Sequence, residues 1–248
     1  MRSRVKVVIG LGNPGSQYAR TRHNVGWLVL DRLADRAGLS GRQKARDAAV
    51  TVRGRHKGMD LVLVKPTTYM NLSGIAVRKI LARERVPLED MLIVVDDFDL
   101  PFGKLRMRAE GSAGTHNGLR SIVTEMETQK WARLRVGIGV GTDGHGGSAR
   151  DHVLTSFSPL EERQLPEVLD AAADAVETWM TDGPARAAER FNAWKPAAPE
   201  PAPGMVAAET PTPASTPTPD PTAPDANGIV RSTTGWRRIL GRGSGGAS

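Results

Sequence analysis

The chain of 248 residues contains no cysteine. That absence excludes disulfide bonds and thiolate metal sites, and it fits a reducing compartment. The opening stretch MRSRVKVVIGLGNPG has too short an apolar run for a signal peptide, and no stretch approaches the length of a membrane span. We therefore expect a cytoplasmic protein with no membrane partner.

Proline is plentiful, but mainly in one region. Residues 196–248 hold 10 of the 17 prolines and almost nothing that could build a core. We therefore expect a disordered, Pro-rich tail that follows a folded domain of residues 1–195. The basic stretch GWRRILGRG near the end of this tail is favoured as a solvated end, and a short contact to RNA, membrane or ribosome is the alternative.

The net charge of the chain belongs to the folded part. Four acidic and four basic residues of the tail cancel, which leaves the whole formal charge of +7 to residues 1–195. A basic domain predicts a polyanionic partner, with nucleic acid the first candidate. A charge that serves only solubility is the alternative.

Short apolar runs rich in Val, Ile and Leu alternate with helical patterns along the folded part. Such alternation predicts an α/β fold: one domain with a central, mostly parallel mixed sheet and helices on both faces. We expect strands over residues 5–10, 50–54, 61–65, 91–95 and 134–140. We expect helices over residues 25–37 (with Asn24 as its N-cap), 70–85, 118–127, 160–180 and 184–193.

A Gly-rich loop, GLGNPG, follows the first strand with the G-x-G-x-x-G spacing of dinucleotide-binding turns. Two features speak against a nucleotide cofactor there. Pro14 precedes the third glycine and the helical period begins only near Val25, whereas in the dinucleotide fold the helix opens inside the turn. The acidic residue expected about twenty positions further on is also missing, because Asp31 falls inside the helix. We expect no cofactor.

Four polar segments follow strands or open helices, so the fold predicts that they meet beyond the carboxyl ends of the strands. They are GNPGSQYARTRHN, KPTTYMNLSG, DDFDLPFG and EGSAGTHNG, and they supply His23, Asp96, Asn13, Asn71, Asn117, Tyr18 and Tyr69. A neutral imidazole can take a proton from water, a carboxylate can orient that imidazole, and amides can bind an oxyanion or a peptide. This inventory favours hydrolysis without a metal or a covalent intermediate.

Each of these residues also has a structural interpretation. Asp96 could cap the turn before Leu100, Asn71 and Asn117 could cap helices, and the two tyrosines could simply pack. The DDFD cluster together with His116 offers possible metal ligands, but no HExxH or comparable spacing supports a metal site.

Read together, GLGNPGSQYARTRHNVGW, KPTTYMNLSG and DDFDLPFGKLRMR followed by GSAGTHNGLRSI resemble the signatures of the bacterial peptidyl-tRNA hydrolase family over roughly residues 5–194. The resemblance implies a monomeric, cofactor-free enzyme that cleaves the ester between peptide and tRNA and so recycles tRNA from peptidyl-tRNA released early by ribosomes. It implies His23 as general base, Asp96 as the group that orients it, and Asn13 as a selector of substrates with a blocked amino group. It further implies substrate or tRNA contacts by Tyr18, Tyr69, Met70, Asn71, Asn117, Arg106, Arg108 and Arg135.

The sequence departs from the family pattern in three places. Thr115 stands where the family usually has glycine, which predicts a stiffer or shifted turn before Asn117. Val95 stands where many members carry histidine, and the tail has no usual counterpart. A non-catalytic RNA-binding relative of the same fold is the alternative function, against which the retention of His23, Asp96, Asn71 and Asn117 argues.

Overall fold

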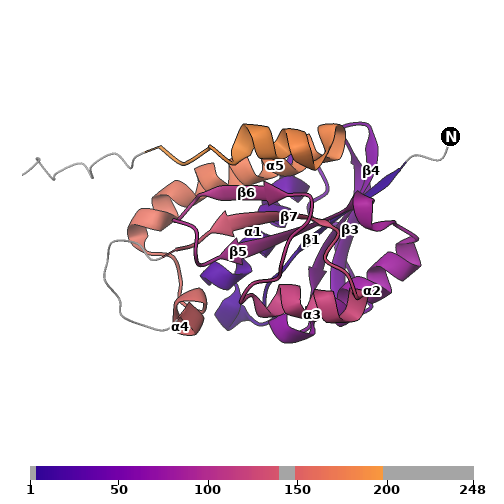
Figure 1. Cartoon of the computed structure of the whole chain (residues 1–248), viewed down its shortest axis with the longest axis horizontal. Coiled ribbons are helices and arrows are strands. Elements are labelled where there is room, and N and C mark those ends of the chain that lie inside the picture. Colours follow the sequence, from indigo (N-terminus) through magenta and orange to yellow (C-terminus); the bar gives the residue numbers. More distant parts are fainter. Residues whose placement is uncertain (1–3, 140–148, 198–248) are drawn as a thin grey trace, which may run out of the picture. The chain divides into compact units, whose positions relative to one another are not determined.

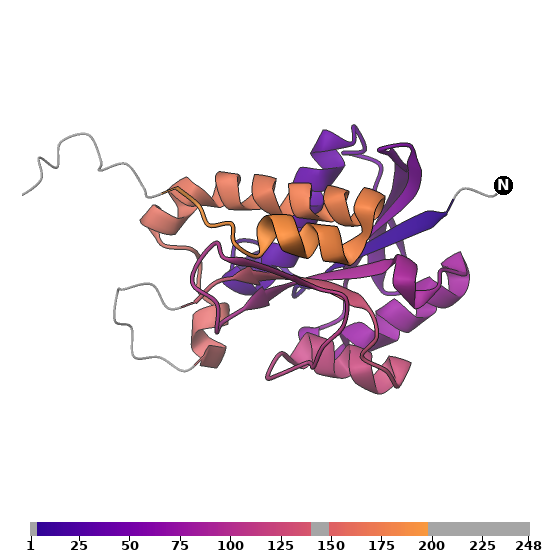
Figure 2. The same cartoon turned by 45° about the horizontal axis from the view of Figure 1, so that its top comes forward.

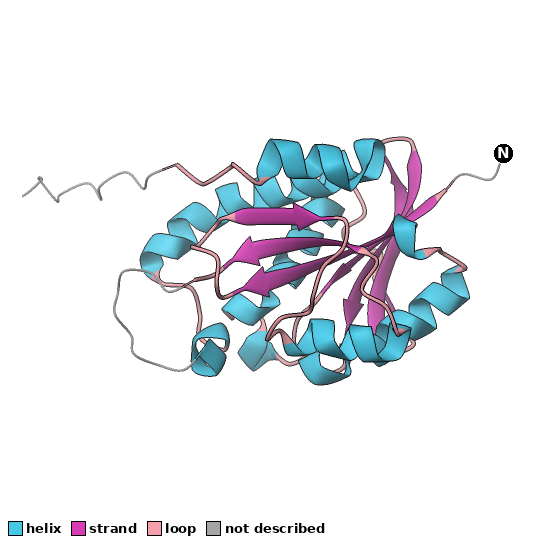
Figure 3. Ribbon diagram, viewed as in Figure 1, coloured by secondary structure: helices cyan, strands magenta, loops and turns pink. Residues whose placement is uncertain are grey.

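The computed structural model describes residues 4–139 and 149–197, and within them a seven-stranded mixed sheet (Figure 1). The four central strands run parallel to one another, and the strands at the two edges are antiparallel to their neighbours, as the reversed direction of β6 in Figure 3 illustrates. In spatial order the strands are β2 (Lys44–Arg46), β3 (Ala49–His56), β4 (Met59–Pro66), β1 (Val5–Gly10), β5 (Met91–Asp97), β7 (Ala132–Gly137) and β6 (Leu105–Arg108).

Helices cover both faces of this sheet, as expected of an α/β fold (Figure 2). One face packs against α1 and α5, and the other against α2 and α3. The helices are α1 (Val25–Arg36), α2 (Ser73–Glu84), α3 (Asn117–Met126), α4 (Ala149–Val153) and α5 (Pro159–Phe191), with short 3-10 turns η1 (Ser16–Tyr18), η2 (Arg22–Asn24), η3 (Met70–Leu72) and η4 (Leu88–Asp90). None of the described helices is long and apolar enough to cross a membrane.

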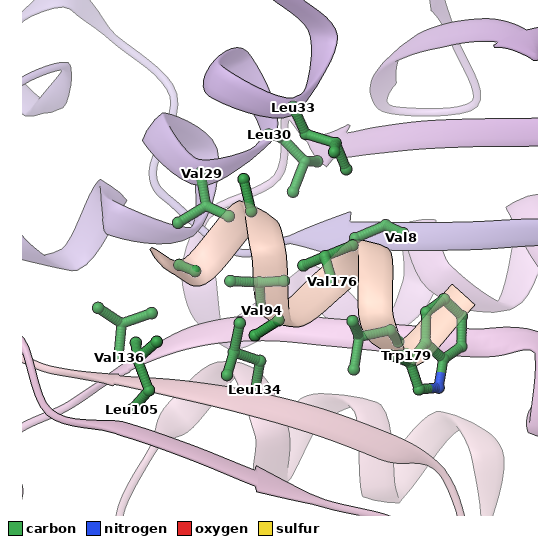
Figure 4. Close-up of a cluster of buried hydrophobic side chains, with 14 of the residues drawn as sticks. Val8, Val29, Leu30, Leu33, Val94, Leu105, Leu134, Val136, Val176 and Trp179 are labelled. Carbon is green, nitrogen blue, oxygen red and sulfur yellow. The ribbon is translucent and has the colours of Figure 1, made fainter. Parts of the chain in front are cut away.

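The central strands are largely apolar because both of their faces are buried. Val8 and Val94 point to the core under α1 and α5, whereas the alternate residues Ile9 and Ile93 point to the core over α2 and α3. Figure 4 shows the first of these cores, where strand side chains meet Leu33 and other residues of the covering helices. Each such burial contributes about 1.5–3 kcal/mol, so the strands form a rigid base for the loops at their ends.

Several elements differ from the sequence-based expectation. The helices predicted over 160–180 and 184–193 are two parts of α5, which is interrupted at Gly183 by a left-handed φ of 82°. Two short edge strands, β2 and β6, and the short helix α4 were not predicted. The predicted strand over 134–140 begins two residues earlier and ends at Gly137, and position 140 lies outside the described residues. Of the predicted disordered tail of residues 196–248, residues 198–248 also lie outside the described residues.

The first helix lies unusually close to the sheet. A Cβ on Gly26 would lie 2.5 Å from the Val94 carbonyl oxygen and 2.7 Å from that of Leu11, so only glycine fits there. This approach brings η2, which immediately precedes α1, against the carboxyl end of β5. His23 and Asp96 thereby come from distant parts of the chain to one edge of the sheet.

Candidate active site

A cleft of about 720 Å³ opens at the carboxyl ends of the parallel strands. Its walls come from the loops after β1, β4 and β5, from the loop before α3 and from the end of α4. Of the residues singled out from the sequence, Asn13, His23, Tyr69, Met70, Asn71, Asp96, Asn117 and Arg135 line it. The four polar segments therefore do meet, as the fold predicts.

His23 and Asp96 form a buried hydrogen-bonded pair. The Nδ1 atom of His23 lies 2.8 and 2.9 Å from the two carboxylate oxygens of Asp96. Asp96 is only 2% exposed. Burial alone would raise its pKa, but the interactions with His23 and with His116 outweigh burial and hold the pKa of Asp96 well below its usual range. The carboxylate is therefore ionised at neutral pH and fixes the His23 ring.

His116 occupies a second position on the same carboxylate. Its Nε2 atom lies 3.0 Å from Oδ1 of Asp96, and its Nδ1 atom accepts from the backbone N–H groups of Gly118 and Leu119. His116 is thus the N-cap of α3, and the alternative interpretation that Asn117 caps this helix is wrong. Asp96 likewise caps no turn, since the neighbouring Asp97 carboxylate accepts from the Asp99 N–H.

Asn13 is held by two separate contacts that orient its amide. Its side-chain oxygen accepts from the Met70 backbone N–H at 2.9 Å. Asn24 bonds to both backbone groups of Asn13: its Oδ1 accepts from the Asn13 N–H and its Nδ2 donates to the Asn13 carbonyl. Asn24 is the N-cap residue of α1, as predicted, but its side chain bonds to Asn13 and makes no cap hydrogen bond. Among the described residues the Asn13 Nδ2 has no partner, which leaves it as a free donor on the cleft wall.

The η3 turn and Tyr69, which directly precedes it, present three residues to the cleft. Met70 is buried, whereas the Tyr69 side chain is 59% exposed at the rim and Asn71 is exposed beside it. Asn71 lies inside η3 and not before a helix, so it is not a helix cap. A Cβ on Gly118 would lie 2.5 Å from the Met70 sulfur, so a glycine at this position lets α3 begin against Met70.

The remaining predicted residues lie around the cleft. Tyr18 is half-buried in η1 and is not among the residues that line the cleft, so its substrate contact stays a prediction. Thr115 is exposed at the rim; the left-handed φ angles of its turn fall on Gly111 and Gly114, so threonine introduces no such strain. Val95 is fully buried in the core over α2 and α3, which suits an apolar residue.

Arginines of β6 and β7 form a basic face beside the cleft. Arg106 is paired with Arg135 in the sheet register, and Arg108, two residues along, lies on the same face of β6. Arg135 donates to Asp97 at 3.2 Å and to the Ser112 carbonyl at 3.0 Å. Arg106 and Arg108 do not line the cleft, and among the described residues neither has an ion-pair partner.

Sequence reasoning missed Arg133, which organises the loop before His116. Its buried guanidinium donates to the carbonyls of Gly111, Gln129 and Trp131. Burial lowers its pKa to about 10, and the nearby Arg135 and Arg108 act in the same direction. The alternation of arginine and apolar residues in ARLRV is the sequence signal that could have placed Arg133 on the same face as Arg135.

Ligand atoms of His23, Asp96 and His116 lie within 4.8 Å of one another, a spacing that a metal ion could bridge. The hydrogen bonds do not suit a metal. Because Nδ1 of His116 accepts two backbone N–H bonds, a metal on Nε2 would require a fully deprotonated imidazolate. The donor set fits a hydrogen-bonded network better than a metal centre.

A buried imidazole–carboxylate pair lies beside amide side chains at the carboxyl ends of the parallel strands, and these are the groups that hydrolysis by water requires. The comparisons with known proteins agree. The peptidyl-tRNA hydrolase family model matches residues 7–199. The chain therefore belongs to the peptidyl-tRNA hydrolase family, and it is a hydrolase of peptidyl-tRNA.

Relatives that are themselves peptidyl-tRNA hydrolases match this chain over nearly their whole length. The peptidyl-tRNA hydrolase of Chloroflexus aggregans is 47% identical over 187 residues, covering 75% of this chain and 98% of its own. That of Cytophaga hutchinsonii is 47% identical over 191 residues, covering 76% and 98%. The crystal structure of the Acinetobacter baumannii peptidyl-tRNA hydrolase is 34% identical, covers 79% of this chain and 99% of its own, and superposes with a TM-score of 0.71.

Proposed function

We propose that His23 is the general base of this hydrolase, which cleaves the ester between a peptide and tRNA. The observation that carries the proposal is the pairing of Nδ1 of His23 with both oxygens of Asp96 at 2.8 and 2.9 Å. An ionised carboxylate only accepts, so this pairing favours the tautomer with the proton on Nδ1, whose Nε2 lone pair is left for a water molecule. Water activated in this way attacks the ester carbonyl, and Asp96 stabilises the imidazolium that forms.

In this proposal Asn13 selects substrates whose amino group is blocked. Its Oδ1 is occupied by the Met70 N–H, so the group it offers to the cleft is the Nδ2 donor. A donor can bind the carbonyl of an N-acyl group or peptide. It repels the ammonium of a free aminoacyl ester, because that group is also a donor and is charged. The same amide therefore favours peptidyl-tRNA and disfavours aminoacyl-tRNA.

The other amides and apolar residues of the cleft hold the substrate. Asn71 and Asn117 lie on the cleft wall and can bind the peptide backbone or the 3′ end of the tRNA. Met70 forms an apolar floor, and Tyr69 at the rim offers a ring on which a base or side chain can stack. We assign Tyr18 to the same substrate surface from its place in the family motif.

The basic face of β6 and β7 binds the tRNA backbone in this proposal. Arg106 and Arg108 have charges that no described acidic residue neutralises, and Arg135 connects this face to the cleft. Phosphate contacts of this kind release counterions, so binding weakens as salt concentration rises. They also account for the net positive charge of the folded part.

The decisive experiment incubates the purified chain with N-acetyl-aminoacyl-tRNA in the presence of a metal chelator. We expect release of free tRNA and of the N-acetylated amino acid. The His23→Ala protein serves as the control for contaminating activity. Binding of the tRNA without release by the wild-type chain would contradict the proposal and would favour a non-catalytic RNA-binding role.

We further propose that residues 1–195 form the catalytic domain and that the enzyme acts as a monomer in the cytoplasm. The tail of residues 196–248 is dispensable for hydrolysis in this proposal. It is available for contact with RNA or the ribosome. Light scattering of the full chain tests the monomer. Co-sedimentation with ribosomes, with and without the tail, tests the contact. Equal sedimentation of the two forms would contradict a role of the tail.

A further inference from the structure

His116 lies within the GSAGTHNGLRSI segment, where the sequence predicted no role for it beyond that of a possible metal ligand. Both nitrogens of its ring are hydrogen-bonded inside the protein. The side chain is 8% exposed. Its Nδ1 lies 3.1 Å from the Gly118 nitrogen and 3.3 Å from the Leu119 nitrogen, and its Nε2 lies 3.0 Å from Oδ1 of Asp96. One ring thus connects the start of α3 to the carboxylate that orients His23.

These contacts determine where the proton of the ring lies. The backbone N–H groups of Gly118 and Leu119 are obligatory donors, so Nδ1 of His116 must carry the lone pair. In the neutral ring the proton is then on Nε2, which donates to Asp96. A doubly protonated ring would place an N–H against two other N–H groups and would lose the helix cap. The N-terminus of α3 therefore holds His116 as the neutral Nε2–H tautomer.

Asp96 consequently accepts from two imidazoles at once. Oδ1 is shared between Nδ1 of His23 at 2.8 Å and Nε2 of His116 at 3.0 Å. The second donor spreads the negative charge of the carboxylate, so less of that charge acts on His23. The other charged groups of the cleft are Asp97, Asp99 and Arg135, and Asp97 is paired with Arg135 at 3.2 Å.

We propose that His116 is a positioning residue for hydrolysis: it fixes the Asp96 carboxylate between η2 and α3 and limits how strongly that carboxylate favours the charged form of His23. The proposal rests on the proposed role of His23 as general base. Because the His116 ring also caps α3, which begins at Asn117, the same ring fixes the position of Asn117 relative to the His23–Asp96 pair.

Two variants separate the two contacts of His116. In His116→Asn the side-chain oxygen can still cap α3, since asparagine is a preferred N-cap residue, but the shorter side chain does not reach Asp96. His116→Ala removes both contacts. We expect the melting temperature to fall in the alanine variant and to stay near that of the wild type in the asparagine variant.

The readout is the pH dependence of kcat for N-acetyl-aminoacyl-tRNA hydrolysis. In both variants we expect the acid limb of the profile to move to higher pH by about half a unit to one unit, because the carboxylate then acts on His23 alone. We also expect kcat at neutral pH to fall about tenfold while KM changes little, because the contact is not made to substrate. A merely structural role would move the melting temperature and leave the pH profile of the asparagine variant at its wild-type position, and that result would overturn the proposal.

A measurement without turnover keeps the proposal testable if the variants fold poorly. Long-range ¹H–¹⁵N correlation spectra of the imidazoles in the full wild-type chain report which ring nitrogen carries the proton. We expect His116, assigned through the asparagine variant or by its coupling to the backbone of α3, to carry it on Nε2. A proton on Nδ1 would disprove the arrangement. Hydrolysis by the wild type, with none by His23→Ala, is measured alongside, so a failure of the general-base role is recognised separately.

Discussion

One corner of the cleft and the basic face beside the cleft are built in opposite ways. At the corner of His23, Asp96 and His116 the polar groups are buried and bonded to one another. On the basic face of β6 and β7, Arg106 and Arg108 have no described partner. A proton transfer needs reacting groups that are already fixed, whereas a flexible polyanion needs cations that are still free. The comparison predicts that substitutions at the corner change kcat, and that substitutions on the basic face change binding.

The largest expected effect comes from His23→Ala. Without the general base, turnover should fall by up to about 10⁴-fold, while the affinity for tRNA stays within a few-fold of the wild type, because the basic face is untouched. Single-turnover kinetics and filter binding with N-acetyl-aminoacyl-tRNA measure the two quantities. If affinity fell as much as turnover, the corner and the basic face would not be separable.

Asp96→Asn should have the next largest effect. The carboxylate accepts from both imidazoles, and an amide that accepts from one must direct its NH₂ group at the other. We therefore expect turnover to fall about 10²–10³-fold and the His23 tautomer to be lost in part of the population. A pH–rate profile identical to that of the wild type would contradict the orienting role of Asp96.

The same substitution changes the acid stability of the protein. Because the pKa of Asp96 in the folded state is lowered from its ordinary value of 3.8, its ionised form stabilises the fold above that pH. This contribution is lost as pH falls below about 4 toward the lower pKa of the folded state. Urea denaturation at pH 7 and pH 3 should show a smaller drop in stability for Asp96→Asn than for the wild type. Equal drops would mean that Asp96 is not held ionised by its neighbours.

Asn13→Asp should change which substrate is accepted. The carboxylate can still accept from the Met70 N–H, but its second oxygen replaces the free donor with an acceptor. We expect the preference for N-acetyl-aminoacyl-tRNA over free aminoacyl-tRNA to fall by about 10–100-fold in kcat/KM. Asn24→Ala is the matched control, because it loosens the Asn13 backbone without changing the group offered to the substrate. A similar loss of preference in the control would show that orientation, and not donor chemistry, decides selection.

Arg108→Ala tests the basic face. Loss of one phosphate contact should weaken tRNA binding by about threefold to tenfold and lower the slope of log affinity against log salt by about 1. kcat should stay unchanged at saturating substrate. Arg46→Ala is the control, because Arg46 is an exposed arginine on β2 at the opposite edge of the sheet. Equal losses in both variants would mean that net charge, and not this face, binds the tRNA.

The comparison also shows what the sequence could predict. β1 has the predicted bounds. Because both of its faces are buried, its residues form a continuous apolar run that can be recognised from the local sequence alone. β6, with the sequence LRMR, could not be recognised in this way, because it is a strand only through its pairing with β7. Local pattern therefore predicted the centre of the sheet better than its edges.

The candidate site divides in the same manner. His23 and Asp96 were predicted from the family motifs, and the fold brings them together. The roles of Asn24 and His116 were not predicted, because each depends on a partner elsewhere in the chain: Asn24 bonds to Asn13 and His116 to Asp96. An asparagine before a helix predicts a side-chain cap bond to that helix. The Asn24 side chain instead bonds to the backbone of Asn13, which only the folded chain brings near.

The smallest effect is expected from removing the tail. Truncation after Pro199 should leave kcat and KM within about twofold of the full chain, because the cleft and the basic face are complete without it. Truncation after Lys195 removes two contacts as well: the Ala197 carbonyl accepts from Gln164, and the Ala197 N–H donates to Glu167. It should therefore lower the melting temperature slightly without changing the pH–rate profile. If truncation after Pro199 abolished hydrolysis, residues beyond the described domain would belong to the catalytic unit, and the boundary proposed at residue 195 would be wrong.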